Sequence, residues 1–142
     1  MLYYLVVYFF WRNKPGKSFV RVFTNKPFDR WAKKTTITDN QLVNAAVEVV
    51  RGEWDADLGG ALYKKRIAET GKGKSGSYRT LIAMKVNGTV FFLHGFKKND
   101  KGNITGKEKA ELKKLAKVYV RLTDVQLNIA KIGKALREIK NG

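Results

Sequence analysis

The chain contains no cysteine, one histidine and two prolines in 142 residues. The absence of cysteine excludes disulfides, and nothing in the composition favours an oxidising compartment. The single histidine, His94, cannot build a zinc site without thiolates or a carboxylate cluster. Asp55 and Asp57 are closely spaced acids, but two carboxylates without further oxygen ligands indicate a solvated turn rather than a cation site. We therefore expect neither a metal ion nor a cofactor.

Acidic residues are scarce as well, since 12 of them stand against 29 lysines and arginines and leave a net charge of +17. Such an excess implies an anionic partner, and the phosphates of RNA or DNA are the usual one. A membrane surface or an acidic protein remains an alternative. A length of 142 residues and an apolar content of 44% indicate one folded domain with a core of its own.

The N-terminal apolar run, residues 2–11 (LYYLVVYFFW), is short for a membrane span. A spanning helix needs about 20 apolar residues. The run also lacks the basic region and the small-residue cleavage site of a signal peptide. Its β-branched and aromatic residues favour a buried strand, or an extension that aggregates if it is left uncovered. We expect residues 1–17 to be an apolar extension and linker, residues 18–142 to be a single domain, and no membrane partner.

Apolar periodicity together with start and stop signals predicts most of the elements. Threonine capping boxes mark three helix starts, at Thr38, Thr105 and Thr123. In chain order the sequence predicts a strand over Ser18–Asn25, a short helix over Pro27–Lys34, a helix from Thr38 that Gly52 ends, a loop over Glu53–Ala61, a strand over Leu62–Ala68, a hairpin, a helix over Thr105–Leu122 and a last amphipathic helix with Leu127, Ala130, Leu136 and Ile139.

The hairpin lies within residues 71–103, around Asn87-Gly88. That dipeptide between two apolar runs indicates a type I′ turn, in which both central residues have positive φ. Cations flank both ends of the hairpin, and the ends of an antiparallel pair lie side by side. We therefore expect one cationic edge of the sheet to be the functional centre, formed by Lys72, Lys74, Arg79, Lys97, Lys98 and Lys101.

Strand alternation predicts which side chains share a face. Lys64 and Arg66 fall on one face of the strand before the hairpin, and Lys65 falls on the other. Counting by twos places His94 with Val90 and Phe92, beside a core. His94 is then either a structural residue or a general acid or base, because its unperturbed pKa of about 6.5 is close to working pH.

The glycine-rich loop Gly71–Ser77 contains the tripeptide Gly-Lys-Ser, which invites a nucleotide-binding interpretation. The phosphate-binding motif requires a glycine five residues before that tripeptide, where this chain has Ala68. The loop also leads into a strand, so no helix N-terminus faces a phosphate. We reject an NTPase and keep a basic loop that brings Lys72 and Lys74 to a phosphodiester backbone.

The hairpin and its sequel, GKGKSGSYRTLIAMKVNGTVFFLHGFKKNDKGNIT followed by KEKAELKKLAKVY, resemble the RelE-like branch of the RelE/ParE superfamily of type II toxin–antitoxin toxins. The similarity runs from about Phe23 to Leu127 and leaves residues 1–17 outside. It implies an α+β fold, a small antiparallel sheet with N-terminal helices and a C-terminal helix. It also implies a cytoplasmic protein whose partner is an acidic antitoxin.

The resemblance implies two different activities. RelE-like members cleave mRNA, commonly in the ribosomal A site, whereas ParE-like members inhibit DNA gyrase and cleave nothing. A basic nucleic-acid-binding module without activity is the third alternative. The leading hypothesis is a metal-independent endoribonuclease that acts on mRNA on the ribosome.

The same resemblance assigns phosphate-binding or catalytic positions to Arg79, Arg66, Lys64, Lys97 and Lys98, whereas His94 and the loop lysines are predicted from their own chemistry and position. Arg79 matches the arginine that contacts the scissile phosphate in RelE-like nucleases, although a surface cation on a half-exposed strand is its plain alternative. This branch has tyrosine where His94 stands, and no residue matches the C-terminal tyrosine of RelE. The predicted catalytic residues are Arg79, Arg66, Lys97, Lys98 and His94, and the predicted RNA-binding residues are Lys64, Lys65, Lys72, Lys74 and Lys101.

Overall fold

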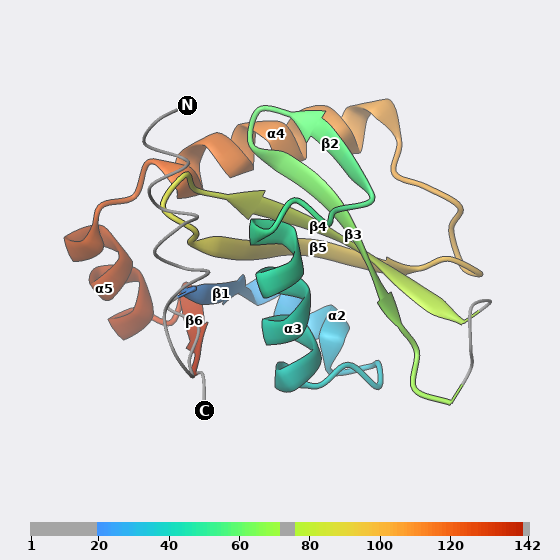
Figure 1. The fold of residues 1–142 in the computed structure, drawn as a ribbon. Helices are drawn as coiled ribbons and strands as arrows, with labels where there is room; N and C mark the ends of the chain where they lie inside the picture. Colours follow the sequence, from blue (N-terminus) through green and yellow to red (C-terminus); the bar gives the residue numbers. More distant parts are fainter. Residues whose placement is uncertain (1–19, 72–75, 141–142) are drawn as a thin grey trace.

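A six-stranded sheet runs through the middle of the molecule, with helices on both faces (Figure 1). The computed structural model describes residues 20–71 and 76–140. The strand order is β2-β3-β4-β5-β1-β6, and every neighbouring pair is antiparallel except β1 with β5. The strands are β1 (Val22–Asn25), β2 (Ala56–Gly59), β3 (Leu62–Ala68), β4 (Ser77–Met84), β5 (Val90–Lys97) and β6 (Leu136–Ile139).

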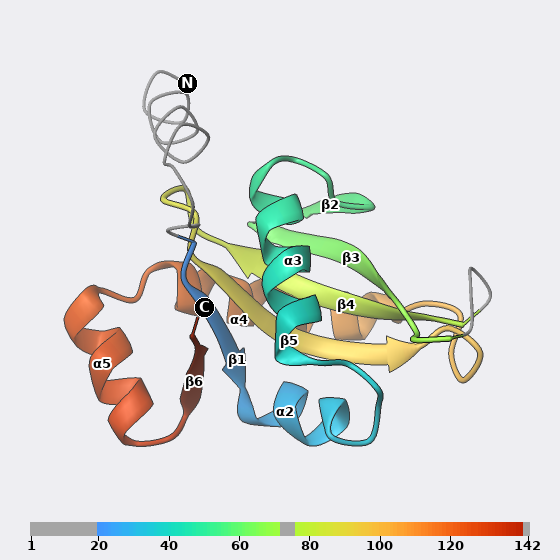
Figure 2. The same ribbon diagram turned by 60° about the horizontal axis from the view of Figure 1, so that its bottom comes forward.

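Each face of the sheet has its own core. Helices α2 (Lys26–Ala32) and α3 (Asp39–Val50) cover one face, where Phe28 and Val49 pack with Phe92. Helix α4 (Gly106–Val120) covers the other face, and α5 (Asp124–Ile132) lies beside β6 (Figure 2). Ala116 and Leu127 of these two helices are buried in the same cluster as Leu81 and Phe91. The α+β architecture with N-terminal and C-terminal helices is as predicted.

All three predicted capping boxes are present. Thr38, Thr105 and Thr123 each accept a hydrogen bond from the backbone N–H three residues later, at 3.1–3.2 Å. The side chain at that third position returns the bond to the threonine backbone in each case. These boxes satisfy N–H groups that a helix start otherwise leaves without partners, which is why the predicted helix starts are accurate.

Two short edge strands were not predicted. The expected loop over residues 53–61 contains β2, which pairs with β3. Leu136 and Ile139 were expected in the last helix, but they lie in β6, which pairs with β1. Helix α5 ends because Lys134, just after its Gly133 cap, adopts a left-handed φ of 64°, and the chain then turns back.

The hairpin turn is not of type I′. Gly88 has a φ of 92°, but Asn87 is not among the described non-glycine residues with positive φ. The Gly88 N–H donates to the Lys85 carbonyl at 3.0 Å, and the Lys85 N–H donates to the Thr89 carbonyl at 2.8 Å. These bonds define a three-residue loop in which a turn over Val86 and Asn87 is followed by the left-handed glycine.

Some expectations concern segments outside the described residues. These are the extension and linker over residues 1–17, the first part of the strand predicted from Ser18, and the loop cations Lys72 and Lys74. Within the described ranges, no helix combines the length and the apolar character that a membrane crossing needs.

Candidate functional site

Three of the predicted cations lie on the face of the sheet that α4 covers. Arg66 of β3 pairs directly with Arg79 of β4, and Lys64 pairs with Leu81. Leu81 is fully buried in the core beneath α4. Because residues two apart on a strand share a face, Lys64, Arg66 and Arg79 all project to that side, as alternation predicted for Lys64 and Arg66.

A β-bulge in β5 places His94 on the same face. Ile82 pairs with Phe92 and Leu81 pairs with His94, so Leu93 is an extra residue opposite a single step of β4. Phe92 belongs to the core under α2 and α3, whereas Leu93 belongs to the core under α4. The prediction that His94 shares a face with Phe92 is therefore wrong, because the bulge interrupts the alternation. His94 is a diagonal neighbour of Arg79 across β4 and β5.

The same bulge separates Lys97 from the arginines. Lys97 pairs with Tyr78, whose hydroxyl lies 3.3 Å from Thr36 on the opposite side of the sheet. The Lys97 ammonium lies 3.3 Å from the carboxylate of Glu69, which is buried. Lys97, which was predicted to be catalytic together with Arg66 and Arg79, therefore faces the opposite side of the sheet from the two arginines.

Short-range contacts hold the two arginines. The Arg66 guanidinium lies 3.5 Å from Asp55, and the other oxygen of the Asp55 carboxylate accepts a hydrogen bond from the Arg66 backbone at 2.6 Å. About half of the Arg66 side chain is exposed. Arg79 is half-buried and donates to the hydroxyl of Ser77 on its own strand. The ion pair of Arg66 and the hydrogen bond of Arg79 each engage only part of a guanidinium group. Both arginines therefore have N–H donors left that could bind a phosphate.

His94 is half-buried next to an ion pair at the start of α4. Its ring centroid lies 6.1 Å from that of Phe96. Burial is the main cause that lowers the pKa of His94 below 6.5; Glu108 acts against this shift and Lys101 acts with it. The hydrogen bond from Lys101, with a second one from the Thr105 backbone, lowers the pKa of Glu108 to about 2. At neutral pH the imidazole is therefore neutral beside the charged carboxylate of Glu108.

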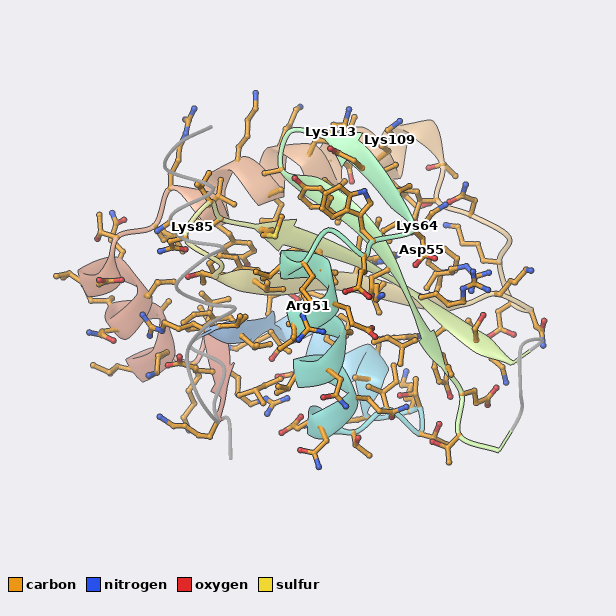
Figure 3. The ribbon with its side chains drawn as sticks, in the orientation of Figure 1. Arg51, Asp55, Lys64, Lys85, Lys109 and Lys113 are labelled. Carbon is orange, nitrogen blue, oxygen red and sulfur yellow. The ribbon has the colours of Figure 1, made fainter. Side chains whose placement is uncertain are left out.

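The remaining predicted cations differ in how they are placed. Lys64 is half-buried and lies next to Asp55, whose N–H donates to the Lys64 carbonyl at 2.8 Å (Figure 3). Lys65 lies on the other face, where its ammonium contacts Glu48 at 3.1 Å and the Glu53 carbonyl at 2.6 Å. Lys98 is exposed just after β5. Lys65 is thus occupied in joining β3 to the end of α3, away from the arginines.

Three residues of the site were not singled out in the sequence for this role. Asp55 orients Arg66, and Glu108 sets the charge beside His94. Lys113 of α4 lies against the β2–β3 turn, where a Cβ on Gly59 would be 3.5 Å from its ammonium nitrogen. The capping box at Thr105 predicted where Glu108 sits on α4, but nothing in the sequence indicated that this helix start would meet His94.

A hollow lies at the far edge of the sheet from these residues. It measures about 530 Å³ between α2, the end of α5 and β6. Arg137 forms hydrogen bonds of 3.0–3.2 Å with both Asp29 and Asp39, which raise its pKa above the ordinary value, with the Asp29 bonds as the largest cause. None of the predicted site residues lines this hollow, whose walls are Lys26, Asp29, Arg30, Lys33, Lys131, Lys134, Leu136, Arg137 and Glu138.

Comparison with models of protein families places this chain in a known family. A family model described as the RelE toxin of the RelE / RelB toxin-antitoxin system matches residues 20–139, which include every strand and helix of the described residues. A search of curated proteins finds no match. Among residues 20–71 and 76–140, no three histidine, aspartate or glutamate side chains are close enough to hold a metal ion. The family match covers most of the chain and agrees with its sheet and helix order, so the chain belongs to the RelE toxin family of toxin–antitoxin systems.

Proposed function

We propose that this chain is a metal-independent endoribonuclease that cleaves mRNA on the ribosome, in the cytoplasm. The observation that supports this proposal best is the common face of Arg66, Arg79 and His94, a pair of phosphate-binding forks beside a neutral imidazole. Membership of the RelE family implies an antitoxin partner. An acidic antitoxin would be attracted to a chain with a net charge of +17.

The reaction that suits these groups is attack by a ribose 2′-hydroxyl on its own 3′-phosphate. A bond forms between the 2′ oxygen and phosphorus while the bond from phosphorus to the 5′ oxygen breaks. The products are a 2′,3′-cyclic phosphate and, once the leaving oxygen has taken a proton from water, a 5′-hydroxyl. Arg79 and Arg66 would bind the non-bridging oxygens and stabilise the charge that builds up on them. Lys64 and Lys113 would bind neighbouring phosphates of the same strand.

His94 would take the proton from the 2′-hydroxyl. A general base must be unprotonated at working pH, and burial keeps the pKa of His94 below 6.5. The charged Glu108 nearby would stabilise the imidazolium that forms during the reaction. Related toxins with tyrosine at this position would need a different general base. If His94 is the base in this chain, the cleavage rate should depend on pH as the imidazole titrates.

Arginine-to-alanine substitution tests the proposal directly. We expect Arg79→Ala to reduce the single-turnover cleavage rate of mRNA on translating ribosomes by roughly 10²–10³, the loss typical of one transition-state donor. The matched control is Lys97→Ala. It also removes one positive charge at the same end of the β4–β5 hairpin, but from the opposite face of the sheet. We expect it to retain most of the activity.

Several outcomes would count against the proposal. Equal loss of activity in the two variants would mean that net charge, not the site, is responsible. RNA left intact by the antitoxin-free parent chain, with and without ribosomes, would remove the nuclease altogether. Inhibition of gyrase supercoiling by the same preparation would favour the ParE-like alternative.

A further inference from the structure

Large exposed aliphatic side chains gather at one end of the molecule. Helix α5 carries three of them, Val125, Ile129 and Ile132, with 68%, 63% and 83% of their surface exposed. The spacing of four and then three residues puts them on one stripe of the helix. A contiguous exposed apolar patch on a protein of this size indicates a surface that something covers.

The other two large aliphatic residues that are exposed in the described part lie near the junction between α4 and α5. Val118 is in the last turn of α4, just before the junction with α5. Val86 is in the β4–β5 turn, and its neighbour Lys85 donates a hydrogen bond of 2.7 Å to the carbonyl of Leu122 in that junction. Figures 1 and 2 both show the β4–β5 turn, the end of α4 and α5 at the same end of the molecule.

The described chain also begins at this end. Arg21 forms an ion pair of 3.6 Å with Asp124, the first residue of α5. The Arg21 carbonyl accepts a hydrogen bond of 2.9 Å from Val90, at the foot of the β4–β5 turn. The described chain therefore starts close to the N-terminus of α5 and to the β4–β5 turn.

We propose that the N-terminal segment, residues 2–11, covers the apolar end formed by Val86, Val118, Val125, Ile129 and Ile132. The segment has ten apolar or aromatic residues and no charge. The nine steps between consecutive Cα atoms from Trp11 to Val20 reach at most about 30 Å, while α5 is about 14 Å long, so the whole stripe is within range. Attachment to the chain beside the patch gives the segment an effective concentration in the millimolar range, which favours it over a second copy.

This interaction is independent of the proposed ribonuclease. The stripe lies on α5, beside β6, whereas Arg66 and Arg79 lie on β3 and β4 towards the other edge of the sheet. Contact with the stripe would also shield the segment itself, because an exposed run of β-branched and aromatic residues is prone to aggregate.

Thiol labelling of the full chain tests the proposal, because the natural sequence contains no cysteine. The thiol introduced by Ile129→Cys reports on the stripe, and the thiol introduced by Lys107→Cys, exposed in the first turn of α4, is the matched control. We expect a maleimide to label the Ile129→Cys variant at least about tenfold more slowly than the control, since burying an aliphatic contact of this size is worth that factor. Adding Leu5→Asp and Val7→Asp to the same chain should abolish the difference and leave the control rate unchanged.

Three outcomes would overturn the proposal. Equal labelling of the two thiols in the parent chain would show that nothing covers the stripe. Protection that grows with protein concentration would show that a second copy covers it. Labelling that slows only when an antitoxin is added would assign the stripe to that partner. A far-ultraviolet circular dichroism spectrum unchanged from the parent shows that each variant is folded.

Discussion

Gly95 is a position where a single methyl group should be costly. A Cβ built on Gly95 would lie 2.1, 2.4 and 2.6 Å from three ring carbons of Trp31, well inside the 3.4 Å at which ordinary contact begins. The indole cannot retreat easily, because its centroid lies 5.5 Å from the ring of Phe28 and 5.6 Å from the ring of Tyr78. We expect Gly95→Ala to displace Trp31 from the sheet.

The magnitude follows from what the indole would lose. Overpacking a core costs about 1–3 kcal/mol, and removing a large aromatic side chain from its packing costs about 3–5 kcal/mol. Replacing glycine by alanine in a strand returns about 0.5–1 kcal/mol through the restricted backbone of the unfolded chain. We therefore expect Gly95→Ala to lower the free energy of unfolding by about 3 kcal/mol, which corresponds to roughly 10 °C in Tm.

A double-mutant cycle with Trp31→Leu separates this clash from other effects. Urea and thermal unfolding would be followed by circular dichroism for the parent, both single variants and the double variant. In the Trp31→Leu background, Gly95→Ala should be neutral or slightly stabilising, since the blocking ring is gone. A full loss of about 3 kcal/mol in both backgrounds, or no loss in the parent background, would refute the assignment of Gly95 to the close approach of Trp31.

Three further predictions concern titration and helix capping. The single-turnover cleavage rate should rise with pH through a pKa below 6.5 and then level off, and His94→Gln should lower the rate and remove that rise in a pH–rate profile. The hydrogen bond from Arg21 is the main cause that lowers the pKa of Glu138 to about 2, so Glu138→Gln should cost about 1–3 kcal/mol in free energy of unfolding at pH 7. Because a depressed carboxyl pKa stabilises the fold above its unfolded pKa, that difference should vanish as pH falls from 4.5 towards 2 in urea titrations. Thr105→Ala should cost about 1 kcal/mol in thermal unfolding and should raise the pKa of Glu108, measured by NMR titration, by removing part of its capping box.

Local chemistry explains which elements the sequence predicted well. The helix starts at Thr38, Thr105 and Thr123 depend on bonds within four residues, so their signals are complete in the sequence. The edge strands β2 and β6 depend instead on partners far along the chain. Each has four residues, and the residues of β6 have a spacing that a helix would also accept, so only the pairing with β1 decides its conformation.

The candidate site divides in the same way. Alternation within β3 correctly placed Lys64 and Arg66 together, because that strand is regular. The same rule failed for His94, since it assumes one residue per step and the strand has one residue too many. The bulge places Leu93 in the core under α4. Because this packing depends on a helix that follows later in the chain, the hairpin sequence alone could not predict the bulge.

The extra residue in β5 has a consequence for how relatives of this chain should be aligned. A relative with a regular strand would be one residue shorter here, and the gap belongs at Leu93, where both neighbours keep their partners on β4. With the gap placed one or two positions later, residues that face α4 in one protein would be equated with residues that face Trp31 and α2 in the other. Substitution statistics drawn from such an alignment would assign the position of His94 to the wrong column.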